Sequence, residues 1–193
     1  MIDEEAFRKK VLLWALGSKR AVQEFTEEGF LPYLEADKKA LSAALGFNST
    51  RSLYIHGPVG CGKSHIAAIA IRQVIKRGTA ARTILAQDMI RESWSTSSQS
   101  EKSRMIQEIA VYPVLCIDDL GTGRWTEDGI AVISELIHKR WLAHMGGLIV
   151  TSNLSLDQLA ALFGDDRITS RLYHLCEIIS WSVDAPDRRM VQP

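Results

Sequence analysis

Short apolar runs alternate with helical patterns along most of the chain. The runs lie at residues 53–56, 82–86, 114–117, 147–151 and 178–181. Between them, residues 63–76 and 126–144 have apolar residues at helical spacing. Strands that alternate with helices predict a parallel sheet with helices on both faces, and continuous apolar runs suit strands that are buried on both sides. The predicted fold class is therefore α/β.

Two helical patterns precede the first of these strands, at residues 3–16 and 35–45. They stop at Gly17 and Gly46, and glycine is a common residue at the end of a helix. We expect residues 1–49 to form a short helical segment and residues 50–193 to form the main domain. The N-terminal segment either packs on that domain or binds a partner.

The composition agrees with one compact domain and limits how nucleic acid could be bound. Of the 193 residues, 46% are hydrophobic and 24% are charged, and 23 basic residues balance 23 acidic ones. A neutral chain has no overall positive field for nucleic acid, so any such contact must be local. Residues 51–112 are the basic part, with nine Lys and Arg against four Asp and Glu.

Nothing in the sequence predicts a membrane span or export. No stretch approaches the roughly 18 apolar residues that a span needs, and the first residues are acidic where a secretory signal would be basic. The three cysteines are widely spaced, which indicates neither a disulfide framework nor a metal site. We expect a cytoplasmic protein without membrane contact.

A phosphate-binding loop follows the first predicted strand. Residues 57–64 fit the pattern G-x-x-x-x-G-K-[ST] and open a helix, as the mechanism of this motif requires. Backbone N–H groups surround the phosphates, Lys63 reaches the β- and γ-phosphates, and the Ser64 hydroxyl can bind Mg²⁺. We expect ATP and Mg²⁺ as cofactors. The predicted nucleotide-binding residues are Gly57, Pro58, Val59, Gly60, Cys61, Gly62, Lys63, Ser64 and His65.

Two carboxylates end the apolar run at residues 114–117. Such a strand places an acid at the carboxyl edge of the sheet, beside the phosphate loop. We expect Asp118 to hold Mg²⁺ and Asp119 to orient or deprotonate the attacking water. An Asp where many such ATPases have Glu indicates slow turnover. The alternative for Asp119 is a helix cap or a surface acid.

Polar residues also follow the strand at 147–151. Asn153 could bond to the attacking water or the γ-phosphate, although Asn at a strand end is most often a turn residue. Farther along, Arg167 and Arg171 are four residues apart and share one face of a helix. Either arginine is a surface ion-pair partner or a group supplied to the ATP of a neighbouring subunit.

Four elements in order resemble one family of ATPases. They are the phosphate loop and residues 117–121, 151–155 and 167–172, and together they look like the AAA+ ATPases of the DnaC/DnaI helicase loaders and the IstB transposition helpers. The resemblance covers roughly residues 50–183. It implies a P-loop sheet of order 5-1-4-3-2, Asn153 as a sensor of the γ-phosphate, and Arg167 or Arg171 as a finger acting in trans.

The chain departs from that family in two places. It stops about ten residues after the last strand, so we expect no helical lid domain after the core. Only about fifty residues precede the core, so the module with which such loaders grip a helicase is expected to be reduced or missing. This departure weakens the helicase-loader assignment and leaves a DNA-linked ATPase.

The sequence therefore favours a slow ATPase that assembles on DNA as a homo-oligomer and delivers a helicase or a transposase. One alternative is a nucleotide-gated protein-binding module with negligible hydrolysis, and another is a small-molecule phosphotransferase. Trp94 is a candidate stacking residue for DNA, although a solvated helical face would show the same pattern. The candidate DNA-binding cations are Arg72, Lys76, Arg77, Arg82, Arg91, Lys102 and Arg104.

Overall fold

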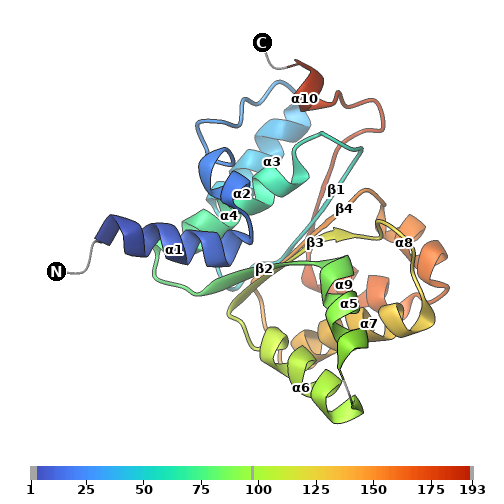
Figure 1. Cartoon of the computed structure of the whole chain (residues 1–193). Helices are drawn as coiled ribbons and strands as arrows, with labels where there is room; N and C mark the ends of the chain where they lie inside the picture. The colour runs from blue at the N-terminus through green and yellow to red at the C-terminus, as the bar shows by residue number, and fades with distance from the viewer. Residues whose placement is uncertain (1–3, 97, 192–193) are drawn as a thin grey trace.

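The computed structural model describes residues 4–96 and 98–191 and has a five-stranded parallel sheet at its centre (Figure 1). The strand order is β2-β3-β4-β1-β5. Every neighbouring pair is parallel, and the order is the predicted 5-1-4-3-2 read from the other edge. The strands are β1 (Leu53–His56), β2 (Ala81–Leu85), β3 (Val114–Leu120), β4 (Leu148–Ser152) and β5 (Glu177–Ser180).

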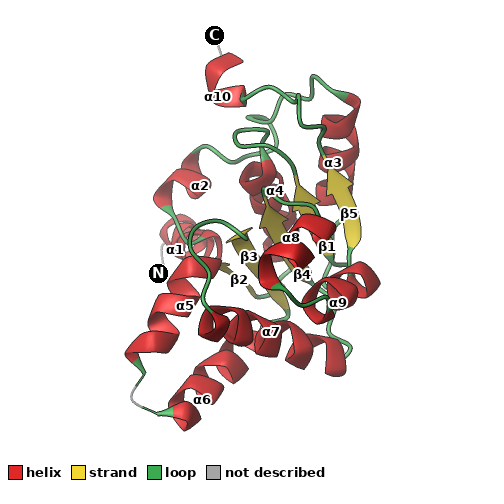
Figure 2. Ribbon diagram, turned by 90° about the vertical axis from the view of Figure 1, so that its right-hand side faces the viewer, coloured by secondary structure: helices red, strands yellow, loops and turns green. Residues whose placement is uncertain are grey.

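Helices cover both faces of the sheet, as Figures 1 and 2 show. Helices α1 to α4 share one hydrophobic cluster with the sheet, and helices α5 to α9 share the other. Those of the first layer are α1 (Glu4–Leu16), α2 (Lys19–Gln23), α3 (Glu35–Leu45) and α4 (Lys63–Lys76). The rest are α5 (Ala86–Ser95), α6 (Gln99–Ala110), α7 (Glu127–Leu142), α8 (Leu156–Phe163), α9 (Arg167–Leu175) and the short α10 (Arg188–Val191).

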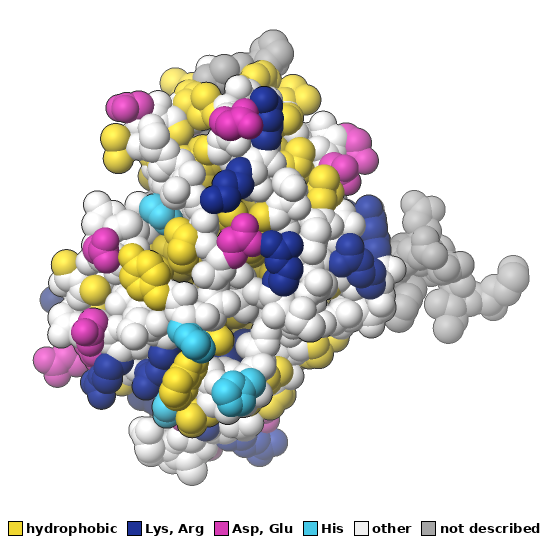
Figure 3. Space-filling model, turned by 180° about the vertical axis from the view of Figure 1, so that it is seen from behind, with side chains coloured by type: hydrophobic (Ala, Val, Ile, Leu, Met, Phe, Trp, Pro, Cys, Tyr) yellow, Lys and Arg dark blue, Asp and Glu magenta, His cyan; other side chains and the backbone are white. Residues whose placement is uncertain are grey.

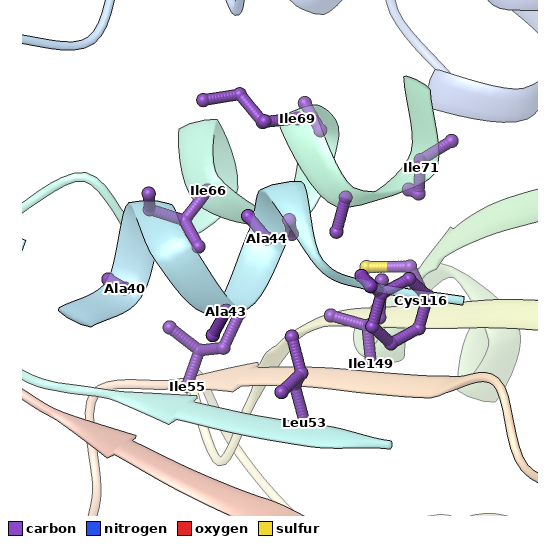
Figure 4. Packing of buried hydrophobic residues seen from close by; sticks show 14 of the residues in the cluster. Ala40, Ala43, Ala44, Leu53, Ile55, Ile66, Ile69, Ile71, Cys116 and Ile149 are labelled. Carbon is purple, nitrogen blue, oxygen red and sulfur yellow. The ribbon is translucent and has the colours of Figure 1, made fainter. Parts of the chain in front are cut away.

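Alternate residues of the central strands β1, β3 and β4 belong to opposite layers, which explains why these strands are apolar along most of their length. Leu53 and Ile55 pack under α3 and α4, among Ala43, Ala44 and the isoleucines of α4 (Figure 4). Tyr54, between them in β1, belongs to the other cluster. A strand with two buried faces has no position for a polar side chain until it ends, so polar groups gather at the sheet's edge.

The N-terminal segment packs on the core. Helix α3 lies on α4, and α1 lies along β2 and α4. Arg72 of α4 ties the two parts together, since its guanidinium donates hydrogen bonds to backbone carbonyls of residues 21, 22 and 25. The prediction of Arg72 as a DNA-binding cation was therefore wrong, because this side chain is already held inside the protein.

Two helices, α5 and α6, follow β2 and include most of a serine-rich stretch of the chain. Helix α5 continues to Ser95, and α6 begins at Gln99 with the Ser98 hydroxyl accepting a hydrogen bond from the Glu101 backbone N–H. Serine is a good N-cap because its side chain satisfies a backbone donor that the helix leaves unpaired.

Among the described residues, no helix is long and apolar enough to cross a membrane.

A fully buried arginine links three segments of the second layer. Arg140 of α7 has no exposed surface, and its guanidinium donates to the carbonyls of Ala110, Tyr112 and Gly146. Burial lowers its pKa to about 10, which still leaves it charged at neutral pH. No sequence pattern indicates this role, because all three partners are brought to Arg140 only by the tertiary fold.

Candidate nucleotide site

The loop between β1 and α4 has the backbone shape of an anion-binding turn. Gly60 has a φ of +80° and Gly62, the N-cap of α4, has a φ of +106°. L-residues with a side chain rarely adopt these angles, so both positions require glycine. The loop directs the N-terminus of α4, with its unpaired N–H groups and positive dipole end, toward the space that phosphates would enter.

Lys63 lies at the first turn of α4 and is largely buried. Its ammonium donates hydrogen bonds to the carbonyl oxygens of Gly57, at 3.0 Å, and Pro58, at 2.8 Å. Burial lowers the pKa of this lysine, while the nearby carboxylates of Asp118 and Asp119 act to raise it. The loop therefore carries a positive charge close to two acidic groups, which is the charge pattern that Mg²⁺-bound phosphates need.

Asp118 and Ser64 are in contact, although 54 residues separate them in the sequence. The Ser64 hydroxyl donates to Asp118 Oδ1 at 3.0 Å, and the Thr151 hydroxyl of β4 donates to the same oxygen. Burial raises the pKa of Asp118, and these hydrogen bonds act in the opposite direction. Hydroxyl and carboxylate oxygens are the ligands that Mg²⁺ prefers. Ser64 and Asp118 thus fit the metal that the sequence assigned to them.

Asp119 lies in a local irregularity of the sheet. The pairing of β3 with β4 shifts register between Ile117 and Leu120, and Asp119 adopts a φ of +58°. Its backbone N–H donates to Thr151 Oγ1 at 3.0 Å. A left-handed conformation outside glycine costs about 1–3 kcal/mol and is concentrated at functional sites. The bulge separates Asp119 from Asp118, so that two successive carboxylates can serve different roles.

Asn153 follows β4 at the same edge of the sheet. Ser152, next to it, pairs with His56 of β1 and Leu120 of β3, so β4 ends between the phosphate loop and the acidic residues. The Asn153 side chain is partly exposed and donates to Thr122 Oγ1 at 3.4 Å. Asn153 thus lies at the same edge of the sheet as the phosphate loop and Asp118, and its role as a sensor stays a prediction.

The two candidate finger arginines lie elsewhere, on the surface shared by α7 and α9. Arg167 is exposed and forms an ion pair with Asp165, at 2.7 Å. Arg171 is half-buried, with its guanidinium 5.7 Å from the ring centre of Trp141. Both line a groove of about 590 Å³ along α7. Within the described part of the chain, neither arginine forms a hydrogen bond or an ion pair with the phosphate loop, and their role as a finger stays a prediction.

His65 and Cys61 contribute to this region in ways that the sequence did not indicate. The His65 ring bonds to the Thr26 carbonyl at 2.6 Å and stacks on Phe25, so it holds the N-terminal segment. The ring nitrogen Nε2 is therefore engaged within the protein and does not bind phosphate. Cys61 is buried in the loop, and burial raises the pKa of its thiol, which makes it a packing residue.

Thr151 and Arg188 are site residues that the sequence analysis missed. The position of Thr151 at the end of β4 is a signal that could have identified it, because the ends of parallel strands lie at one edge of the sheet. Arg188 donates to the Cys61 carbonyl of the phosphate loop at 3.0 Å. An arginine near the end of the chain has no local signal of that kind.

The family described as IstB-like ATP binding protein matches residues 3–190. An ATP-binding protein of an insertion sequence in Mycobacterium tuberculosis is 28% identical over 149 residues, which are 77% of this chain. The match spans 58% of that relative's length. An insertion-sequence ATP-binding protein of Sinorhizobium fredii is 24% identical over 142 residues, 72% of this chain and 47% of the relative.

Solved structures of replication proteins have the same fold. The DnaC helicase loader superposes with a TM-score of 0.75 and 23% identity, over 86% of this chain and all of the DnaC chain. The replication initiator DnaA, bound to AMPPCP and single-stranded DNA, gives a TM-score of 0.65 and 20% identity, over 84% of this chain and 51% of the DnaA chain. Both therefore share the fold of this chain, in which helices flank a parallel sheet.

Proposed function

Because the chain belongs to the family of IstB-like ATP-binding proteins, we propose that it is a slow, assembly-dependent ATPase that acts on DNA and recruits a transposase or a helicase. The arrangement of Ser64 and Thr151 around Asp118 is the observation that carries the ATPase part. It places an oxygen ligand set for Mg²⁺ beside the lysine of the phosphate loop. Ser64 and Asp118 would hold Mg²⁺ there, and the ion would supply positive charge to stabilise the charge that develops on the phosphates.

The residues of the site divide the work of hydrolysis. Lys63 and the N-terminus of α4 bind the phosphates, and Ser64 and Asp118 hold the metal. Asp119 orients the attacking water and accepts its proton, and Asn153 senses the γ-phosphate. Positioning and charge stabilisation supply most of the rate enhancement in phosphoryl transfer, so these fixed side chains are the catalytic apparatus.

Asp119→Asn tests the ATPase assignment. We expect ATP affinity to stay within about threefold of wild type, because the phosphate and Mg²⁺ ligands are intact, and phosphate release to fall by about 100-fold or more because the base is lost. Calorimetry measures the first quantity and a phosphate-release assay the second. Asp157→Asn, an exposed acid of α8, is the matched control. Wild-type hydrolysis in the Asp119 variant would assign this residue a structural role.

Phosphate release measured with and without added DNA separates this function from its main alternative. A nucleotide-gated binding module would bind ATP with the same residues and release no phosphate under any condition. A phosphotransferase would transfer the γ-phosphate to an added acceptor instead of releasing it. The proposal requires phosphate release that increases when DNA is present.

The DNA part of the proposal rests on helices α5 and α6. Lys and Arg are mixed with Asp and Glu on the face that Figure 3 shows, in agreement with the neutral net charge. On α5 and α6, Arg91, Lys102 and Arg104 accompany Trp94, whose side chain is about half exposed. Arg91 and Arg104 form ion pairs with Asp88 and Glu108, while Trp94 and Lys102 line one pocket. An exposed aromatic ring beside a cation suits single-stranded nucleic acid, where bases can stack and phosphates can pair.

Reversing two of these charges, with Arg91→Glu and Lys102→Glu together, should weaken DNA binding by at least about tenfold and reduce its salt dependence by roughly one unit of log–log slope per lost phosphate contact. ATP affinity should not change. Fluorescence anisotropy of labelled single- and double-stranded oligonucleotides measures the effect. Lys39→Glu on α3 is the control, because α3 lies toward β5 at the opposite edge of the sheet from α5. Unchanged binding would mean that these cations are solvated surface.

A further inference from the structure

The last described part of the chain lies directly against the glycines of the phosphate loop. A Cβ atom built on Gly60 would be 2.0 Å from the Asp187 carboxylate, and one on Gly62 would be 3.2 Å from the Arg188 side chain. A Cβ atom built on Gly57 would be 2.9 Å from the Cβ atom of Trp181. In Figure 1, α10 accordingly lies at the same end of the molecule as α3. Residues 181–189 therefore form a wall beside the phosphate loop.

Arg188 fixes this wall in place. Its backbone N–H donates to the Gly60 carbonyl at 3.0 Å, and its side chain donates to the carbonyls of Cys61, at 3.0 Å, and Leu31, at 2.7 Å. It also forms an ion pair with Asp37, at 2.5 Å. These bonds attach the segment both to the phosphate loop and to the N-terminal part of the chain.

Asp37 makes this attachment strong because it is a buried carboxylate with several donors. It accepts a hydrogen bond from the Trp181 indole at 2.7 Å, in addition to the pair with Arg188. Burial would raise the pKa of Asp37, but the hydrogen bonds from Trp181 and the Leu34 backbone, together with Arg188, lower it. The carboxylate stays charged, so the position of residues 187–189 relative to the loop is well defined.

Next to this fixed point, Asp187 and Arg189 form an exposed ion pair over the loop. Arg189 donates through Nε to Asp187 Oδ1 at 2.8 Å and through Nη2 to Oδ2 at 2.5 Å. Asp187 thus places a negative charge against Gly60, in a loop whose backbone is arranged to receive anions. A phosphate entering that loop meets a competing carboxylate and a cation within reach.

We infer that Arg189 is a phosphate ligand of the nucleotide site and that Asp187 competes with the nucleotide for it. When a triphosphate occupies the loop, the Arg189 guanidinium moves from the carboxylate to a phosphate oxygen. The inference extends the proposed ATP site and rests on it. It adds a nucleotide-sensing pair from outside the four motifs that identify the family.

The energetics favour this exchange. An exposed ion pair contributes little stability, so breaking the pair between Asp187 and Arg189 costs little free energy. A guanidinium pairs with phosphate in the same bidentate geometry as with carboxylate, and a triphosphate carries more charge than one carboxylate. Arg189 is already close enough to act on the loop: burial is the main cause of the lowered pKa of Lys63, and the positive charge of Arg189 adds to it.

Calorimetric titration of Mg²⁺–ATP into the wild type and four variants tests the inference. Arg189→Gln should bind ATP about tenfold more weakly than wild type, because a charge-assisted bond is lost. Asp187→Asn should bind about threefold more tightly or better, because the competitor is gone. In the double variant the gain from Asp187→Asn should shrink, since competition for Arg189 requires Arg189. Arg20→Gln, which breaks a similar exposed pair with Glu24 on α2, should match wild type.

The outcomes separate this inference from the function on which it rests. One outcome is that wild type binds ATP and Lys63→Ala does not, while Asp187→Asn and Arg189→Gln bind ATP as the Arg20→Gln control does. That result would refute the role of the Asp187–Arg189 pair and support the proposed ATP site. If the gain from Asp187→Asn is the same with and without Arg189, Asp187 only repels the nucleotide and the competition is refuted. If wild type itself binds no ATP, the proposed function and the inference both fail.

Discussion

Replacing Lys63 with alanine should abolish ATP binding, raising Kd by about 100-fold or more. The ammonium lies 3.0 and 2.8 Å from two carbonyls of the loop, where incoming phosphates would exchange for those carbonyls as its partners. Strong charge-assisted bonds to phosphate are then lost in a partly buried site, where they are worth most. No other lysine lies in the loop or the first turn of α4, so the loss is not compensated.

Calorimetry with Mg²⁺–ATP and Mg²⁺–ADP measures this effect. Lys38→Ala serves as the control, because Lys38 is exposed on α3, where its ammonium forms an ion pair with Glu35 at 2.9 Å. A thermal unfolding curve for each variant checks that the fold is retained. Wild-type affinity in the Lys63 variant would show that the loop does not bind nucleotide phosphates.

The second large effect is recovery of activity when two inactive variants are mixed. A Lys63→Ala subunit has a phosphate loop that cannot bind ATP but keeps Arg171. An Arg171→Ala subunit keeps a working phosphate loop but lacks the arginine. Each should release almost no phosphate alone. In a mixture, the arginine of the first faces the loop of the second, and an arginine finger contributes about 10³–10⁵ in rate in known cases. Restored phosphate release is therefore readily measured.

The structure favours Arg171 over Arg167 for this experiment. Arg171 is half-buried against Trp141, which limits its motion, whereas Arg167 is exposed and paired with Asp165. A pre-ordered side chain loses less entropy when it enters a neighbouring site. Arg167→Ala is tested in parallel. Mixing Lys63→Ala with Asp119→Asn is the negative control, because both variants lack a working site. Full activity of both arginine variants as purified proteins would refute the trans site.

The parts of this site that the sequence predicted are those governed by local pattern or by strand topology. The loop at residues 57–62 lies between a strand and a helix, so its conformation follows from its own glycines. Asp118 meets Ser64 because the parallel strands β1, β4 and β3 end at one edge. Strand order was the only tertiary information needed, and the resemblance to a known family provided it.

The parts that the sequence could not predict depend on contacts between distant segments. Arg72 appeared to be a surface cation and instead binds carbonyls about 50 positions earlier in the chain. Arg188 reaches Leu31 across 157 positions. Charge and periodicity are the same for an arginine in solvent and for one that binds backbone carbonyls, so only the folded arrangement distinguishes them.

Phosphate release per subunit, measured against protein concentration with and without DNA, tests the central claim most directly. A site completed by a neighbouring subunit predicts that the rate per subunit rises with concentration, and rises further when DNA assembles the protein. The Asp119→Asn variant should stay at background throughout. A rate per subunit that is constant across concentrations and unaffected by DNA would contradict an assembly-dependent ATPase and indicate a self-contained site.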